Sequence, residues 1–334
     1  MGKKEGTLNF VRNNNLILIL IFVFIIGIIA SRNFLTAANL KNIMLNVSMI
    51  GLLAIGQTTV MLVKEIDLSI SSLMAFAPIA AISITKFIKS LSGVSLIEGG
   101  NYITSGMVYI IIFTILIGCL IGAINGFINV RAKVPSIIVT LGMMYTLRGF
   151  AYILSKGHPL YLTKLNGFKW LGTSLFLKIP VSFLIYIAIG VVAILILKFT
   201  KIGNRIYATG GNEKAAIYSG INTGIWKIVA FTFCGFCASI ASLIYSSRLE
   251  SVEAAQATGL ELAAIAIVVI GGTTLQGGRG GIFGTILSGI ILAIIINIIT
   301  SIGLVVWYQT IIMGVIIIVA VFLYLKKSSM KNTI

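Results

Sequence analysis

KIGNRIYATGGNEKAAIYSGI, residues Lys201–Ile221, is a polar and basic stretch between two long hydrophobic runs. Its second half is typical of a short helix. Asn212 is a favourable N-cap, because its side chain can accept a hydrogen bond from a free backbone N–H, and Glu213 follows where the helix dipole favours an acid. Gly220 can end the helix in the left-handed conformation. So short a helix is not stable alone in water, so either it needs a supporting partner or the stretch is an ordinary capped loop.

The composition around this stretch indicates a membrane protein. Of the 334 residues, 58% are hydrophobic and 10% are charged, whereas a soluble domain carries about 25% charged residues. The net charge is +17, and the basic residues gather at the ends of apolar runs, where they set topology and meet anionic headgroups. The sequence therefore predicts an all-α, polytopic membrane protein and not a nucleic-acid-binding one.

The apolar runs predict a single transmembrane domain, residues 1–334, with about ten spans, some of them short or broken. The expected spans are approximately 15–31, 46–63, 70–85, 107–129, 136–154, 180–197, 227–245, 260–270, 282–300 and 305–324. Alternation of sides along these spans places most of the 25 basic residues inside when the N-terminus is inside. The positive-inside rule then favours two cytoplasmic termini and a cytoplasmic loop at 198–226.

Several polar side chains fall within or at the edge of these spans. A polar group that faces lipid lacks hydrogen-bond partners, so such groups should face protein or a wet path. The candidates for a translocation path are Gln57, Asp67, Asn125, Arg148, Asn297 and Gln309. Polar groups between helices can also do no more than hold neighbouring spans together, and that alternative stays open.

Two polar turns interrupt the hydrophobic pattern. KEIDLS, Lys64–Ser69, follows one apolar run, and GGTTLQGGRGG, Gly271–Gly281, follows another. Repeats with discontinuous helices are common in transporters, so these turns are either a weak internal repeat or two unrelated loops. The second turn holds the candidate hinge residues Gly271, Gly272, Gly277 and Gly278.

The motifs of an enzyme are missing from the sequence. It contains no G-x-x-x-x-G-K-[ST] loop for ATP phosphates and no H-E-x-x-H. Cys234 and Cys237 have C-x-x-C spacing, but they lie in an apolar run without a second His or Cys pair, so we expect buried residues at a helix contact. The sequence predicts no catalytic residue, no metal site and no cofactor bound by this chain.

Six stretches in a fixed order then point to a family. They are NFLTAANLKNI (Asn33–Ile43), IDLSISSLMA (Ile66–Ala75), VPSIIVTLGMMYTLRG (Val134–Gly149), IGNRIYATGGNEKAAIYSGI (Ile202–Ile221), GLELAAIAIVVIGGTTLQGGRGGIFGT (Gly259–Thr285) and WYQTIIMG (Trp307–Gly314). With these landmarks the chain resembles the permease subunits of bacterial ABC importers of the ribose, galactose, xylose and autoinducer-2 type. It departs from them before I-D-L-S, where relatives commonly have glycine and this chain has Lys64 and Glu65.

The resemblance implies an ATP-driven importer of a monosaccharide in the bacterial cytoplasmic (inner) membrane. The implied partners are membrane lipid, a second permease that is identical or closely related, a cytoplasmic ATPase with two nucleotide-binding domains that uses ATP and Mg, and an extracytoplasmic sugar-binding protein. The short helix would dock on the ATPase. Under this resemblance the coupling residues are Asn212, Glu213, Ala215, Ala216, Ile217 and Gly220.

Other functions remain as alternatives. The same architecture could import nucleosides or branched-chain amino acids. An ion-coupled secondary transporter would need ionisable groups in mid-membrane, and Glu65 and Asp67 fall at a membrane edge in the expected threading. A passive channel or scaffold would have no use for a docking helix in the cytoplasm.

Overall fold

The computed structural model describes residues 15–91, 97–98, 101–102, 104–163, 167–303, 308–309, 311–315 and 318. Within these residues the regular secondary structure is α-helical apart from three pairs of very short strands. Seven of the described helices are long and apolar enough to cross a membrane. These features define an all-α membrane protein.

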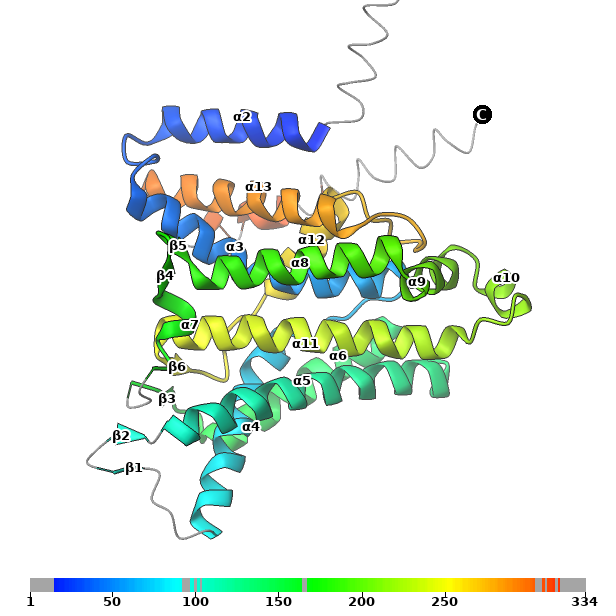
Figure 1. The fold of residues 1–334 in the computed structure, drawn as a ribbon, viewed down its shortest axis with the longest axis horizontal. Coiled ribbons are helices and arrows are strands. Elements are labelled where there is room, and N and C mark those ends of the chain that lie inside the picture. Colours follow the sequence, from blue (N-terminus) through cyan, green and yellow to red (C-terminus); the bar gives the residue numbers. More distant parts are fainter. Residues whose placement is uncertain are drawn as a thin grey trace, which may run out of the picture.

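The helices of membrane-spanning length are α3 (Ala37–Leu62), α4 (Ile70–Leu91), α5 (Thr104–Ala132), α6 (Ser136–Ser155), α8 (Val181–Phe199), α11 (Thr223–Leu249) and α13 (Ile282–Ser301). The shorter helices are α2 (Asn15–Ala30), α7 (Trp170–Thr173), α9 (Lys201–Gly211), α10 (Glu213–Tyr218) and α12 (Leu260–Ile270). The strands pair antiparallel as β1 (Ile97–Glu98) with β2 (Asn101–Tyr102), β3 (Leu160–Tyr161) with β6 (Ser251–Val252), and β4 (Leu175–Phe176) with β5 (Ile179–Pro180). In Figure 1 the helices α2, α13, α8 and α11 run in roughly the same direction across the view, with α9 and α10 at one end of the bundle and α7 at the other.

Helices occupy the positions of the first nine expected spans, but some are longer than the apolar runs. α3 begins at Ala37 and not near residue 46, because Thr36 Oγ1 accepts a hydrogen bond from Asn39 N at 3.3 Å and caps the helix. The polar first turns of α3 conceal this start from a hydropathy profile. The expected tenth span, 305–324, lies largely outside the described residues, so the count of ten stays a prediction.

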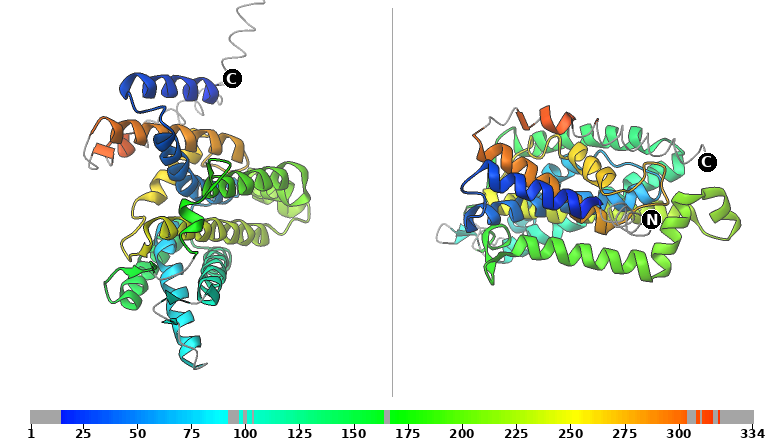
Figure 2. Two further views of the ribbon diagram at one scale, coloured as in Figure 1. Left: turned by 60° about the vertical axis from the view of Figure 1, so that its left-hand side comes forward. Right: turned by 90° about the horizontal axis from the view of Figure 1, so that it is seen from above.

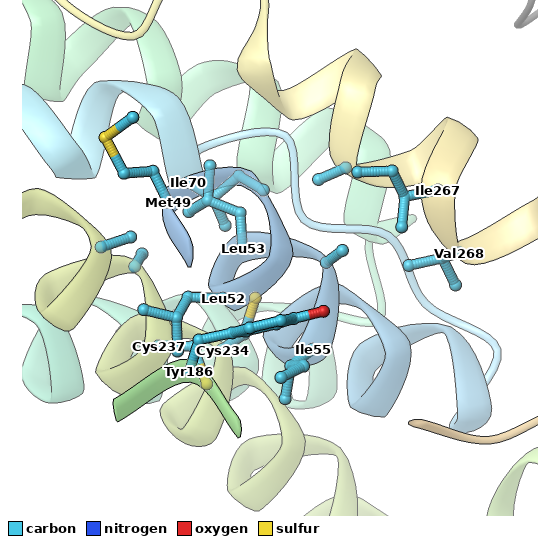
Figure 3. Close-up of a cluster of buried hydrophobic side chains, with 14 of the residues drawn as sticks. Met49, Leu52, Leu53, Ile55, Ile70, Tyr186, Cys234, Cys237, Ile267 and Val268 are labelled. Carbon is cyan, nitrogen blue, oxygen red and sulfur yellow. The ribbon is translucent and has the colours of Figure 1, made fainter. Parts of the chain in front are cut away.

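α3 forms the centre of the bundle, and most of its side chains from Val47 to Leu62 are buried. Figure 3 shows residues of this core, in which Leu52 and Ile55 of α3 lie near Tyr186 of α8. Neighbouring helices can pack closely against α3, because α3 has small residues at the points of contact. A Cβ on Gly51 would lie 2.5 Å from the Tyr186 ring, and a Cβ on Gly56 would lie 2.9 Å from Cys234 Cα.

α5 and α11 pack closely through a row of glycines. Gly118 and Gly122 are one turn apart on α5 and face α11. A Cβ on Gly118 would lie 2.6 Å from Gly235 O, and a Cβ on Gly122 would lie 2.3 Å from Phe231 O. This is the small-residue contact typical of helices in a membrane. Cys234 and Cys237 are both buried on α11, which confirms the expected packing role.

Candidate functional site

The short helix of the sequence prediction is α10, which projects from one end of the bundle (Figure 2). Asn212 has an extended backbone, and its Oδ1 accepts a hydrogen bond from Ala215 N at 3.0 Å. Glu213 occupies the first turn. At the other end Gly220 has φ +78°, and Ile221 N donates to Ala216 O at 3.0 Å. The predicted helix and both of its ends are therefore confirmed.

The side chains of α10 divide between an inner and an outer face. Ala216 is only 4% exposed and packs against the rest of the chain. Ala215 is exposed, Ile217 is 55% exposed and Tyr218 is 92% exposed. The sequence grouped Ala215, Ala216 and Ile217 as contacts for a partner, but the structure places Ala216 on the inner face. Tyr218 belongs with Ile217 on the outer face and was missed, because the direction of each side chain depends on what the helix packs against.

α9 connects α10 to two breaks in the membrane helices. The first break, Val63–Ser69, separates α3 from α4, and the second break, Gly271–Gly281, separates α12 from α13. Gly278 N of the second break donates to Leu62 O at 2.9 Å, and Tyr207 OH of α9 donates to Gly280 O at 2.9 Å. Both breaks and the end of α9 therefore meet at one junction, beside α10.

The C-terminal end of α9 approaches this junction closely. A Cβ on Gly210 would lie 1.7 Å from Leu62 O and 2.8 Å from Gly278 N. No side chain fits there, so the glycine is required by contact. Gly210 was not among the predicted site residues, although a Gly-Gly pair near the end of a helix can indicate close approach of backbones.

The first break is held by side chains. Asp67 is buried, and its Oδ1 accepts hydrogen bonds from Ser69 N at 2.8 Å and Ser69 Oγ at 2.7 Å, just before α4 begins. Asn125 Nδ2 donates to Ser69 Oγ at 2.9 Å. The Gln57 amide faces the backbone N and O of Asp67 at 3.2 and 3.1 Å. The structure therefore brings together Gln57, Asp67 and Asn125, three of the candidate path residues, and each of them bonds to this turn.

The other three candidates lie apart from this cluster. Arg148 donates to the backbone carbonyls of Ala254 and Gln256 in the segment before α12. Asn297 of α13 and Asn39 of α3 exchange two amide hydrogen bonds, at 2.8 and 3.0 Å. Gln309 donates to Thr300 Oγ1 at 3.0 Å. Each of the six candidates has a hydrogen-bond partner within the chain, and four of them, Gln57, Asp67, Asn125 and Asn297, are buried. Contacts between helices therefore suffice to explain their positions, and a role in a path stays a prediction.

The second break is held by glycine conformations. Gly272, Gly277 and Gly278 have φ of +89°, +77° and +68°, a region that side chains disfavour. Gly271 has an ordinary φ but lies against α13, where a Cβ would come 2.7 Å from Thr285 N. The four candidate hinge residues are thus required by backbone shape and by close packing, and a hinge motion stays a prediction.

An ion cluster joins α10 to the first break. Lys227 Nζ, in the first turns of α11, lies 3.0 Å from Glu213 Oε1 and 3.0 Å from Glu65 Oε1. The side chains of Lys227 and Glu65 are 15% and 12% exposed, whereas that of Glu213 is 45% exposed. Sequence reasoning missed this pairing, because 162 positions of chain separate Lys227 from Glu65.

The described residues thus define a multi-pass helical membrane protein, with a projecting helix beside the junction at which the two breaks between membrane helices meet. Among these residues no group of three or more His, Cys, Asp or Glu side chains could hold a metal ion. Over residues 39–321 the chain matches the family described as branched-chain amino acid transport system / permease component. The chain belongs to this family of permease components.

Individual relatives match over nearly the whole chain. The ribose import permease protein RbsC of Escherichia coli (strain K12) is 35% identical over 316 residues, covering 94% of this chain and 93% of the relative. RbsC of Bacillus subtilis (strain 168) is 35% identical over 312 residues, covering 92% and 91%. The D-allose transport system permease protein AlsC of Escherichia coli (strain K12) is 29% identical over 303 residues, covering 91% and 88%. No solved structure matches the chain significantly.

Proposed function

We propose that this chain is the membrane-spanning permease subunit of an ATP-driven ABC importer for a monosaccharide of the ribose type, in the cytoplasmic membrane of a bacterium. Two relatives at 35% identity carry ribose import in their names, and a third carries D-allose transport. Their alignments leave little of this chain uncovered. The cargo is therefore inferred from relatives of full length and not from a shared fragment.

The observation that carries a docking role for α10 is its outer face. Ile217 and Tyr218 are large and exposed on a six-residue helix at the end of the bundle. Aromatic and aliphatic side chains exposed together on a projecting helix are typical anchors for a partner protein. The chain has no phosphate-binding loop of its own, so hydrolysis belongs to a separate ATPase. We assign α10 as the helix on which an ATPase with two nucleotide-binding domains docks, with ATP and Mg bound by that partner.

The docking of α10 on an ATPase determines which side of the membrane each end of the bundle faces and which partner it meets. α10 lies in the cytoplasm, and with about ten spans both termini lie there too. A second permease, identical or closely related, completes the translocation path. An extracytoplasmic sugar-binding protein meets the opposite end, near α7 and the β3–β6 pair. ATP binding moves the docked helices, and the permease switches the side on which it is open.

Substitution of Tyr218 by aspartate tests the docking. Tyr218→Asp places a charge at the centre of the apolar contact, and we expect loss of ATPase co-purification and at least about a tenfold loss of uptake. Tyr161→Asp is the matched control, because Tyr161 is 69% exposed at the other end of the bundle. That control should leave ATPase co-purification unchanged. Normal co-purification with Tyr218→Asp would contradict the docking role.

Uptake by whole cells tests the cargo. Cells that carry the complete transporter should accumulate labelled ribose, and unlabelled related monosaccharides should compete. Accumulation of labelled leucine or of a labelled nucleoside, with no accumulation of ribose, would show that the transporter imports the alternative cargo. Either result leaves the docking test unaffected.

A further inference from the structure

We propose that the ion cluster of Glu213, Lys227 and Glu65 is the link through which α10 moves the first break, so that Lys227 is a positioning residue for transport. This inference rests on the proposed docking of α10 on an ATPase. It goes beyond that docking, because it names the contact that carries the movement from the docked helix into the membrane helices.

α10 has few attachments to the rest of the chain. It is six residues long, and Ala216 is its one buried side chain. A helix of this length is not stable by itself. Three contacts therefore fix its position: the two caps, the burial of Ala216 and the Glu213–Lys227 pair. Of these, the Glu213–Lys227 pair is the one that leads directly to a residue of the first break, Glu65.

On the inner side, Lys227 bonds to a residue of the first break. Glu65 Oε1 lies 3.0 Å from Lys227 Nζ, and Glu65 Oε2 accepts a hydrogen bond from Asn129 Nδ2 of α5 at 3.4 Å. The next residue, Ile66, donates its N–H to Ser136 Oγ at the start of α6, at 3.0 Å. A displacement of Glu65 is thus transmitted to α5, to α6 and to the Asp67–Ser69 turn that begins α4.

The two arms of the cluster differ in their exposure to solvent. The Lys227–Glu65 arm is shielded, with exposed fractions of 15% and 12%, whereas Glu213 is 45% exposed. Water and salt weaken an exposed pair far more than a shielded one. Lys227 therefore stays paired with Glu65, and α10 acts on this shielded pair through the exposed Glu213 arm, whose strength changes when α10 is displaced. This asymmetry suits a contact that must change between two states of a transporter.

α9 supplies a second attachment that keeps the cluster aligned. The Arg205 guanidinium lies 5.3 Å from the centre of the Trp226 ring, next to Lys227 in sequence. α9 and the start of α11 are therefore in contact through this pair. In the proposed link, the Arg205–Trp226 contact keeps α9 beside α11 while α10 acts on Lys227 through Glu213.

The test follows the first break directly in the assembled permease and ATPase, without any sugar. Lys64 is exposed and precedes Glu65, so Lys64→Cys provides a thiol at the break whose rate of maleimide labelling can be compared with and without ATP and vanadate. We expect a nucleotide-dependent change in this rate. In the Lys227→Met background that change should fall about fivefold or more, with the ATPase still bound through Ile217 and Tyr218.

Conservative and distant variants separate coupling from folding. Lys227→Arg should retain the change, because a guanidinium can also bridge two carboxylates. Lys169→Met is the matched control, since the Lys169–Glu250 pair also joins a lysine to a glutamate, at 3.1 Å, but at the other end of the bundle. If Lys227→Met does not assemble, Glu213→Gln removes only the exposed arm and should give the same loss.

The outcomes are distinct. An unchanged nucleotide response in Lys227→Met, or in Glu213→Gln where Lys227→Met does not assemble, would overturn the link even if Tyr218→Asp abolishes docking. Failure of the unsubstituted chain to bind an ATPase would overturn the proposed function and this inference with it. A lost response that Lys227→Arg restores would support the link.

Discussion

The first and second breaks each follow an apolar helix, but different interactions determine their shapes. In the first break, Asp67 and Ser69 supply side-chain hydrogen bonds, and a lysine, Lys64, takes the left-handed conformation with φ +67°. In the second break, positive φ angles fall on glycines. The two are joined directly by Gly278 N and Leu62 O. Side chains hold one turn in a fixed shape, whereas the other depends on backbone that only glycine adopts easily.

The largest effect is expected at the contact between the breaks. A Cβ on Gly278 would lie 2.4 Å from Gly211 Cα at φ +68°, so Gly278→Ala should destabilise the fold by about 3 kcal/mol or more. Gly272→Ala is the control, because Gly272 has φ +89° with nothing within 4 Å, and its cost should be only about 1–2 kcal/mol. Thermal unfolding in detergent measures both. Equal losses would show that backbone conformation alone matters at the second break.

An intermediate effect is expected at the side-chain network of the first break. Asp67→Ala leaves the N–H and hydroxyl of Ser69 without their acceptor, which should cost about 1–3 kcal/mol. Asp67→Asn keeps an oxygen in the Oδ1 position and should lose less. The two midpoints of thermal unfolding, compared in one detergent, check the ranking. A larger loss for asparagine would mean that the carboxylate charge and not the turn is what this position requires.

The smallest effect is expected when the left-handed residue of the first break is replaced by glycine, the residue type found at such positions in the second break. Lys64→Gly removes a side chain from the left-handed region, where a non-glycine residue is strained, and should stabilise the protein by up to about 1 kcal/mol. A higher midpoint of thermal unfolding for Lys64→Gly than for the unsubstituted protein would support this expectation. Lys133→Gly, at φ +54° outside both breaks, provides the comparison. A fall for Lys64→Gly alone would show that the Lys64 side chain contributes to the break.

Local features of the fold could be predicted from residue types. The start and end of α10 follow from Asn212 and Gly220, because a cap depends on neighbours within a few residues. The family resemblance gave no firm turn before Asp67, because Lys64 and Glu65 stand where relatives commonly have glycine, yet Lys64 adopts the left-handed conformation although it is not glycine.

Features that depend on distant segments could not be predicted. The inward direction of Ala216 and the outward direction of Tyr218 depend on what lies beneath α10. Arg148 lies within an expected span, but its partners Ala254 and Gln256 are more than 100 residues away. Hydropathy also cannot show that Gln57 lies against Asp67, because it reports where polar residues occur and not which of them meet.

The glycine contact between α5 and α11 has a consequence for how the chain is made. α5 ends at Ala132 and α11 begins at Thr223, so α5 enters the membrane well before its main partner exists. At about 5–20 residues per second this interval lasts roughly 5–20 s. During that time the bare glycine row of α5 lies open to lipid or to other newly inserted helices. Ribosome speed between these two helices should therefore affect the yield of correctly assembled protein, even where no residue is changed.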